Sequence, residues 1–483
     1  MVRSASIRVT LFYIISISFI ILNLWFVVKK DMVYINALPL VLVIILISIY
    51  SFDKIVYLIA FFTPLSIPLR EYMPGIGFDM YLPTEPLLFG LLIIFLLKVL
   101  SERNFNKDIL LHPVSLVIYL NLFWILISSV SSTMPIVSFK FLLMRIWFVV
   151  GLYLLTAKLF SNGKNMEKYV WLYVTGLIVV VLYSTYRHLG YGLWDKQAAH
   201  FVVSPFYRDH TSYGAATAMH LPFLIMFALN KEFSQKLRWF SAGALAIVFM
   251  GFILSYSRAA WLSLVIAFSV WVMIKLKIRF KPLLISTVSL IALFVMFQSQ
   301  IFMKLEQNAE ESSANMMTHI SSMTNISSDA SNLERINRWS CALRMFADKP
   351  VFGYGPGTYM FQYAPYQLSK DRTIISTNSA DGGNAHSEYL GPMAESGLFG
   401  ALTYLLIIIV VIYTAVNTYT RLNDYRLRSI VLAALAGLIT YYIHGFLNNF
   451  LDTDKISVPF WGFTAMIVAI DIISKKEQKQ SSN

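Results

Sequence analysis

His386 lies in the stretch from Asn384 to Gly400, where a long polar segment returns to a hydrophobic span. A histidine titrates near neutral pH, so at a membrane surface it can take a proton from a hydroxyl group. An apolar residue would serve better if the position only anchored the next helix. The alternative is that His386 caps a helix or extends its ring to the interface. It is therefore a candidate general base.

Three arginines are candidates for holding an anionic group. Arg258 lies in a very short turn between two hydrophobic segments, and Arg335 and Arg338 lie in an amphipathic stretch. A fixed guanidinium can hold a phosphate through paired hydrogen bonds. The alternatives are an arginine that extends to the interface from a helix end, and basic residues that attract lipid headgroups.

Five further residues are candidates because ionisable groups at a membrane usually face a cavity or a partner. We expect Asp209 to cap the helix that follows it, which is favoured over a catalytic role. Lys140 and Arg145 lie at the start of one span and inside it, as they would in a pump or transporter. The other two candidates are Arg208 and Glu388.

Two other patterns are weaker. Asp452-Thr-Asp454 resembles an Asp-x-Asp pair that holds a metal and a nucleotide sugar, but a polar turn before Pro459 is favoured. The glycine-rich stretch 351–358 lacks the strand and the Lys-Ser/Thr of a nucleotide loop, so we expect a turn. No His/Cys cluster suggests zinc, and no metal or cofactor is expected.

The composition is that of a polytopic membrane protein. Of 483 residues, 57% are hydrophobic and only 13% are charged. The net charge of +13 comes from Lys and Arg residues in short loops on alternate sides of the spans, which indicates orientation and no nucleic-acid partner. The single cysteine, Cys341, excludes an internal disulfide.

Hydrophobic segments predict an all-α fold with about 12–14 transmembrane helices and one long, partly helical extracytoplasmic loop. Basic residues mark the cytoplasmic side, so both termini are expected there. Three regions follow: N-terminal helices (1–297), the extracytoplasmic loop (298–391) and C-terminal helices (392–483). The expected spans are 9–28, 34–50, 54–68, 84–100, 113–130, 138–159, 167–187, 211–229, 238–255, 259–276, 282–298, 393–417, 428–446 and 457–473.

The extracytoplasmic loop contains one predicted amphipathic helix. Residues 306–331 are expected to be partly mobile, and Ser331-Asn-Leu-Glu334 has the form of a capping box that opens a helix. We expect this helix to lie on the outer membrane-facing surface and to end at Pro350. Its apolar face is predicted to comprise Ile336, Trp339, Leu343 and Phe346.

Three elements together resemble the family of O-antigen ligases and polymerases, over roughly residues 200–465. The most specific is His386-Ser387, nine residues, then Gly397-x-x-Gly400. Leu254-Ser-Tyr-Ser-Arg258 looks like the Ser-Arg turn of the family. The stretch from Arg335 through Trp339 to Gly357 looks like its Arg-x-x-x-Trp helix and the following Pro-x-x-Gly-x-Gly loop. Pro392 is expected to kink the helix that follows His386 or to start the next span.

The resemblance implies a GT-C-like membrane glycosyltransferase in the bacterial inner membrane, with its active site facing the periplasm. The implied reaction is inverting and metal-independent, with undecaprenyl diphosphate leaving. In it, Arg258, Arg335 and Arg338 bind the diphosphate of the glycan donor and His386 is the base. A ligase acting on lipid A-core is favoured. A polymerase acting on a glycan acceptor and a protein oligosaccharyltransferase remain alternatives, and a flippase would be a different class.

Overall fold

The computed structural model describes most of the chain, in two compact units, Met1–Ile55 and Val56–Asn483. Helix α1 (Val2–Lys30) is the main described element of the first unit, and it exposes the apolar side chains of Ile14, Ile17 and Ile21. Such exposure is expected of a helix that meets lipid. The described residues are 2–30, 51–72, 80–102, 106–276, 318–369, 372–373, 376 and 383–481.

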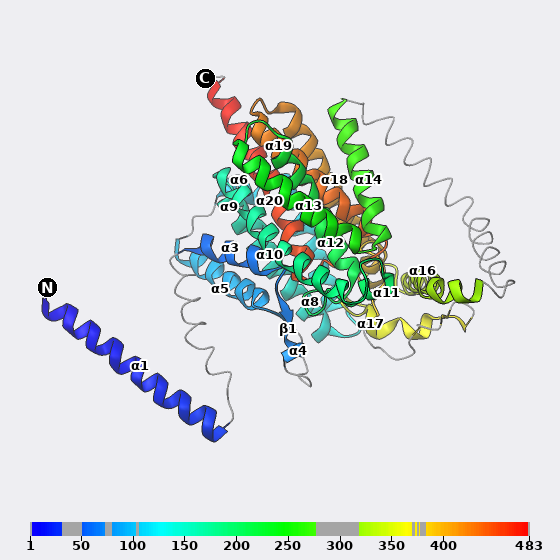
Figure 1. The fold of residues 1–483 in the computed structure, drawn as a ribbon, viewed down its shortest axis with the longest axis horizontal. Coiled ribbons are helices and arrows are strands. Elements are labelled where there is room, and N and C mark those ends of the chain that lie inside the picture. Colours follow the sequence, from blue (N-terminus) through cyan, green and yellow to red (C-terminus); the bar gives the residue numbers. More distant parts are fainter. Residues whose placement is uncertain are drawn as a thin grey trace. The chain divides into compact units, whose positions relative to one another are not determined.

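The second unit is a bundle of helices (Figure 1). Within the described residues, nine helical segments of the chain are long and apolar enough to cross a membrane, which confirms an all-α polytopic membrane protein. They are α7 (Pro113–Val130), the continuous run α8 (Pro135–Phe148), η2 (Val149–Leu155) and α9 (Thr156–Leu159), α10 (Lys164–Leu189), α12 (His210–Leu229), α13 (Gln235–Leu254), α14 (Arg258–Lys275), α18 (Leu390–Arg421), α19 (Tyr425–His444) and α20 (Asp454–Ser481).

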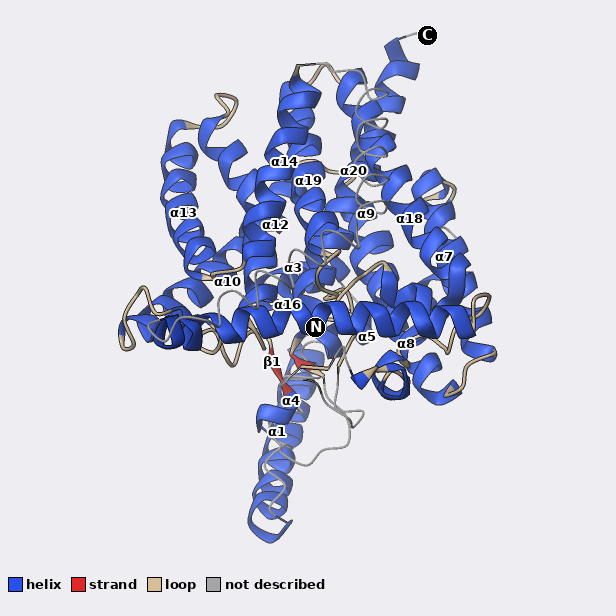
Figure 2. Cartoon of the chain, turned by 90° about the vertical axis from the view of Figure 1, so that its right-hand side faces the viewer, coloured by secondary structure: helices blue, strands red, loops and turns tan. Residues whose placement is uncertain are grey.

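Other elements connect these helices or lie beside them (Figure 2). The longest is α16, which carries two of the candidate arginines. These elements are α3 (Phe52–Phe62), β1 (Ile67–Pro68), α4 (Leu69–Tyr72), β2 (Tyr81–Leu82), α5 (Thr84–Glu102), α6 (Lys107–Leu110), α11 (Lys196–Ala199), α16 (Thr318–Asp348), α17 (Tyr359–Gln362) and η3 (Ala364–Tyr366).

Helices α12, α19 and α20 form the centre of the bundle because their contact surfaces are small or apolar. A Cβ atom at Gly437 of α19 would lie 2.6 Å from the carbonyl oxygen of Met219, so glycine allows α19 to approach α12 closely. The apolar part of α20 is almost entirely buried, and its last residues, 475–480, are exposed. Helices α13 and α14 instead expose large apolar side chains, such as Trp239 and Phe268, as lipid-facing helices do.

The predicted span 54–68 is wrong. Helix α3 ends at Phe62, and β1 pairs antiparallel with β2 just beyond it. Pro64 cannot donate an intrahelical hydrogen bond and disfavours helical geometry in the preceding residue. The turn is fixed instead to α20, where Ser66 donates to Asp454 (Oγ to Oδ2, 2.6 Å). The predicted spans 34–50 and 282–298 lie outside the described residues, so the total of 12–14 remains a prediction.

The predicted start of the amphipathic helix is also wrong. Helix α16 begins at Thr318, so residues 318–331 are helical and Ser331 does not open a helix. The Glu334 carboxylate accepts from Arg338 Nε (2.6 Å) and does not complete a capping box. The side that packs against protein contains Cys341 and Met345, while Leu343 of the predicted apolar face is 48% exposed. The cause is a tyrosine-rich loop, residues 354–366, which covers that side.

Helix α18 is broken at Gly397, where φ is 68°. Pro392 lies in its first turn, so proline starts the span and glycine breaks it. The preceding loop bonds to the broken turn: Leu398 N–H donates to Pro350 O (2.9 Å), and Gly355 N–H donates to Glu395 O (2.7 Å). A Cβ atom at Gly397 would lie 2.0 Å from Val351 O, so only glycine fits.

Candidate active site

His386 lies in a strained turn just before α18. Its φ is 48°, in the left-handed region that few residues other than glycine adopt. Two contacts hold it: His386 N–H donates to Asn384 Oδ1 (3.1 Å), and Trp339 Nε1–H of α16 donates to His386 O (3.3 Å). Within the described residues the imidazole itself has no hydrogen-bond partner. Strain of this kind is common where a side chain must be presented to a substrate.

Burial, together with positive charges from α16, keeps this imidazole neutral. Burial, together with Arg335 and then Arg338, lowers the pKa of His386 to about 4, although Asp209 and Glu334 oppose the shift. Near neutral pH the ring therefore carries a free lone pair, which a general base requires.

The charges of Arg335 and Arg258 act on each other although the two residues lie 77 positions apart in the sequence. Burial lowers the pKa of Arg335, and the charge of Arg258 is the next largest cause. Arg258 is exposed at the first position of α14, which the Ser257 hydroxyl caps by accepting from Ala260 N–H (3.3 Å). Two neighbouring guanidiniums repel each other, and a group with two negative charges would relieve that repulsion.

Arg338 is placed differently from the other two arginines. Its side chain is buried, forms an ion pair with Glu334 (Nε to Oε1, 2.6 Å) and lies over the Tyr363 ring at 3.8 Å. Glu334 also accepts from the Thr373 hydroxyl (3.0 Å). These contacts join α16 to the loop that leads to His386, so they suit a positioning role. Diphosphate binding by Arg338 remains a prediction.

The segment before α12 brings another acidic group to this site. Asp209 caps α12, since its Oδ1 accepts from Thr211 N–H (2.7 Å) and Ser212 N–H (2.8 Å), which confirms the expected cap. Its charge also acts on His386 and Arg335. Arg208 beside it is exposed, with its guanidinium 6.0 Å from the centre of the Tyr81 ring.

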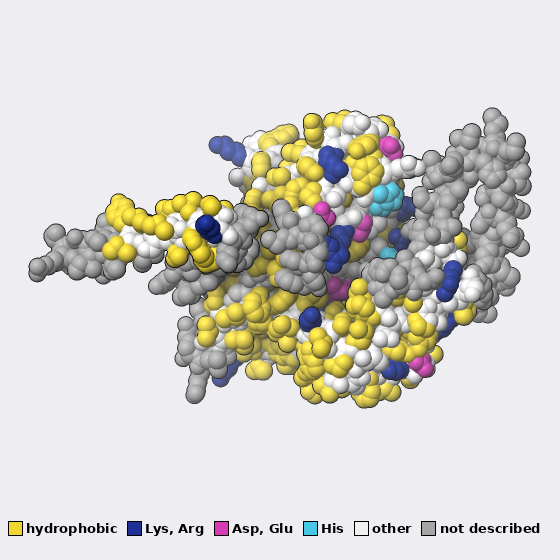
Figure 3. All heavy atoms as spheres, turned by 90° about the horizontal axis from the view of Figure 1, so that it is seen from below, with side chains coloured by type: hydrophobic (Ala, Val, Ile, Leu, Met, Phe, Trp, Pro, Cys, Tyr) yellow, Lys and Arg dark blue, Asp and Glu magenta, His cyan; other side chains and the backbone are white. Residues whose placement is uncertain are grey.

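Two histidines of this segment were missed in the sequence. His210 Nδ1 lies 2.7 Å from Ser255 O in the turn before Arg258, and the His200 ring lies 4.1 Å from the His210 ring. Both histidines are close to Arg208 in the sequence, and this proximity could have identified them as candidate site residues. Figure 3 shows histidine and charged side chains gathered in the middle of one face, between apolar areas. In the described part of the chain, no group of three His, Cys, Asp or Glu side chains is arranged to hold a metal ion.

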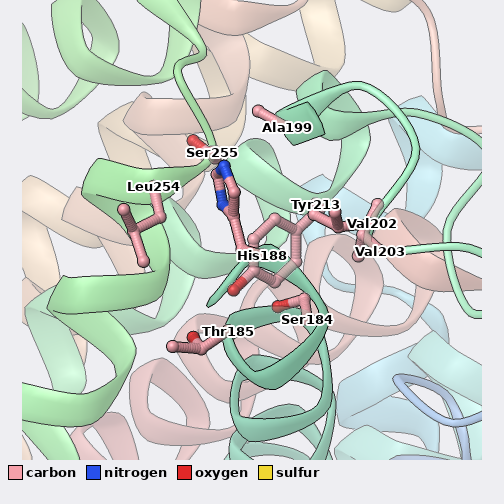
Figure 4. A pocket seen from close by; sticks show the side chains of 9 residues that line it. All are labelled: Ser184, Thr185, His188, Ala199, Val202, Val203, Tyr213, Leu254 and Ser255. Carbon is pink, nitrogen blue, oxygen red and sulfur yellow. The ribbon is translucent and has the colours of Figure 1, made fainter. Parts of the chain in front are cut away.

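A small cavity lies beneath the turn that precedes Arg258. It has about 240 Å³ of empty space, and its lining includes Ser184, His188, Tyr213 and Ser255 from α10, α12 and the end of α13 (Figure 4). Pockets for small ligands usually have about 300–1,000 Å³. The cavity is therefore too small for a glycan. The residues that line it support the turn before Arg258.

Glu388 and Arg145 belong to a second, separate group. Arg145 forms an ion pair with Asp452 (Nη2 to Oδ1, 3.0 Å), and Glu388 Oε1 accepts from Phe450 N–H (2.8 Å) and Leu451 N–H (2.9 Å). Burial, with Asp452 as the next cause, raises the pKa of Glu388 to about 7.

Two candidates remain. Asp452 lies in the turn before α20, as favoured from the sequence, and is the partner of Arg145, whereas Asp454 is the first residue of α20 and accepts from Ser66. Lys140 is exposed on α8 and has no ion-pair partner within the described ranges.

Fold and site together define a multi-pass helical membrane protein with a neutral histidine beside clustered arginines. Residues 243–405 match the family model described as O-antigen ligase, and this range contains Arg258, Arg335, His386 and Gly397. This part of the chain is thus similar to the O-antigen ligase family, which implies glycosyltransferase-like activity on lipid-linked glycans in general. No curated protein matches the chain.

The pKa of His386 predicts how activity depends on pH. With a pKa of about 4 in the free protein, His386 stays neutral as the pH falls from 7 to 5 and becomes protonated only near pH 4. We expect kcat/KM for the donor to fall near pH 4, where His386 becomes protonated, and not near pH 6.5, the usual pKa of a histidine. The profile should be measured in a Glu388→Gln background, because Glu388 has a pKa of about 7. An acid limb near pH 6.5 that is present in this background and absent when His386 is also replaced by asparagine would contradict the lowered pKa of His386.

Proposed function

We propose that the protein transfers a glycan from undecaprenyl diphosphate to lipid A-core on the outer face of the bacterial inner membrane. One observation carries the proposal: the charges of Arg258 and Arg335, from separate helices, act on each other, and Arg335 also acts on the neutral ring of His386. A transfer that expels a diphosphate needs fixed positive charge at the leaving group and a base at the acceptor. Both are present in one site.

In the proposed reaction His386 accepts the proton of the acceptor hydroxyl. The acceptor oxygen then forms a bond to the anomeric carbon, while the bond from that carbon to the diphosphate oxygen breaks. The electron pair of that bond goes to the undecaprenyl diphosphate, where Arg258 and Arg335 stabilise the new charge. Attack opposite the leaving group inverts the anomeric configuration. No metal has a role in these steps.

Other acceptors would use the same chemistry. A polymerase would transfer the glycan to another lipid-linked repeat unit, and a protein oligosaccharyltransferase would transfer it to a serine or threonine. The ligase is favoured because the outer segment, 298–391, is single and of moderate size. A flippase would need charges in a central cavity, and it gives no role to a neutral histidine in a strained turn.

The acceptor can be tested with the purified full-length protein in nanodiscs. An undecaprenyl-diphosphate-linked glycan would be supplied with lipid A-core, with a second lipid-linked glycan, or with a serine-containing acceptor protein. We expect transfer to lipid A-core and free undecaprenyl diphosphate as co-product. Transfer only to one of the other acceptors would replace the ligase by that enzyme, and movement of donor across a bilayer without transfer would support a flippase.

The proposed orientation places the segment before α12 outside and the turn before α13 in the cytoplasm. In a Cys341→Ala background, Trp194→Cys is expected to react with an impermeant thiol reagent in intact spheroplasts, because Trp194 is 77% exposed. Lys231→Cys, also at an exposed position, is the matched control that should react only after lysis. The reverse pattern would overturn both the orientation and the proposed site.

A further inference from the structure

A second pocket lies between α7, α8, α18 and α20, and Arg258, Arg335 and Arg338 do not line it. It has about 530 Å³ of empty space, counting space that is open to the surroundings. Its polar and aromatic lining includes Asn121, Arg145, Glu388, Glu395, Tyr404 and Trp461.

Above the Glu388 pKa of about 7, the charge in this pocket is negative in character. Arg145 is already paired with Asp452 at 3.0 Å and also donates to Leu451 O (3.3 Å). Glu388 and Glu395 each use Oε1 to accept from backbone N–H groups, at 2.8 Å from Phe450 and 2.9 Å from Tyr359 respectively. No hydrogen bond from the described residues reaches the second oxygen of Glu388, whereas Glu395 accepts from the backbone of both Tyr359 and Gly357. The free oxygen of Glu388 can accept from a ligand, and both carboxylates would repel an anion.

Hydrogen-bond donors in the same lining also lack partners. Trp461 is 3% exposed, and its buried Nε1–H has no hydrogen-bond partner within the described residues. The Tyr404 hydroxyl also lacks a hydrogen bond to the described residues, but it is not fully buried. Leaving such a buried polar group unsatisfied is costly, so an occupant that offers oxygen atoms is expected. Aromatic rings beside carboxylates suit a molecule with apolar C–H faces and several hydroxyl groups.

We propose that this pocket binds a neutral, hydroxyl-rich sugar ring of the substrate and excludes acidic sugars. Hydroxyl groups donate to Glu388 and Glu395 and accept from Tyr404 and Trp461. A uronic acid or a phosphate would place an anion beside two carboxylates whose nearby cation is already paired. The pocket thereby determines which glycans the enzyme uses. This inference rests on the proposed transfer function, and either the donor or the acceptor glycan can supply the ring.

Sugar binding can be measured without transfer, by saturation-transfer NMR on the full-length protein in nanodiscs. Galactose and N-acetylglucosamine are the neutral probes, and glucuronate is the acidic probe. We expect signals from a neutral probe and none from glucuronate. Competition by the lipid-linked donor or by the isolated acceptor glycan then identifies which substrate supplies the ring.

Two substitutions test the lining. Glu395→Gln keeps an oxygen for Tyr359 N–H but removes the charge, so it should weaken neutral-sugar binding about tenfold or more and admit glucuronate. Tyr404→Phe should weaken neutral-sugar binding without admitting glucuronate. Glu477→Gln and Tyr425→Phe, at exposed positions, are the matched controls and should bind as the wild type does.

Absence of neutral-sugar binding would mean that the pocket holds water only and would overturn the inference. Unchanged binding in both pocket variants would overturn it as well. The outcome is separable from that of the transfer reaction: a His386→Asn protein should still bind the neutral probe although it cannot transfer. If the wild type proves unable to transfer any lipid-linked glycan while the two pocket variants still change binding, the proposed function fails and the sugar site stands.

Discussion

His386→Asn is expected to reduce glycan transfer by about 100- to 10,000-fold, the usual cost of losing a general base. Asparagine adopts left-handed backbone geometry more readily than most residues, so this substitution suits the φ of 48° at His386. It removes the base without adding strain. Initial rates from purified lipid-linked donor, with donor binding and protein level measured in parallel, give the result.

His386→Ala is the companion variant, because alanine removes the ring but fits the strained turn less well. We expect the same loss of transfer from both variants, with near-normal donor binding. If transfer persists while donor affinity falls, His386 is a binding residue. If the asparagine variant is inactive only because it does not accumulate in the membrane, the turn has a structural role alone.

Arg258→Lys and Arg335→Lys are each expected to slow transfer about 30-fold or more. Losing a charged hydrogen-bond partner costs roughly 2–5 kcal/mol, and an ammonium group cannot reproduce the planar paired bonds of a guanidinium. The measurement is transfer from purified donor at saturating acceptor, together with the affinity for undecaprenyl diphosphate.

Arg426→Lys is the matched control for these arginine variants. Arg426 also forms a close ion pair, with Glu167 (Nε to Oε1, 2.6 Å), but it lies at the start of α19 and outside the proposed site. It should transfer glycan at the wild-type rate. Normal transfer by both Arg258→Lys and Arg335→Lys would show that these residues do not hold the leaving group.

The sequence predicted those parts of the fold that depend on local hydrophobicity. Long apolar segments such as 113–130 and 428–446 became helices close to the expected positions, because a spanning helix needs little beyond length and apolar composition. Residues 54–68 were equally apolar, but Pro64 and the buried contact of Ser66 with Asp454 ended the helix early. That contact joins residues 388 positions apart and has no local signal.

The same distinction applies to the site. The motif around His386 and the two short elements with Arg258 and Arg335 could be recognised one by one, and the structure brings their charges together. The buried face of α16 could not be predicted, because a loop that follows the helix decides which side is covered. The pairing of Arg145 with Asp452 was hidden for the same reason, since the two residues are 307 positions apart.

The break at Gly397 gives a fixed length to the interval between His386 and the part of α18 that follows the break. The chain is held at one end by Trp339, which donates to His386 O, and at the other by Pro350, which accepts from Leu398 N–H. One residue inserted into the first turns of α18 would rotate the preceding segment by about 100° and move it by about 1.5 Å along the axis. The imidazole would then face a different direction from the arginines. The number of residues between Ser387 and Gly397, which is nine, thus sets the position and direction of the His386 side chain. For the chemistry, this number matters more than the identities of most of the nine residues.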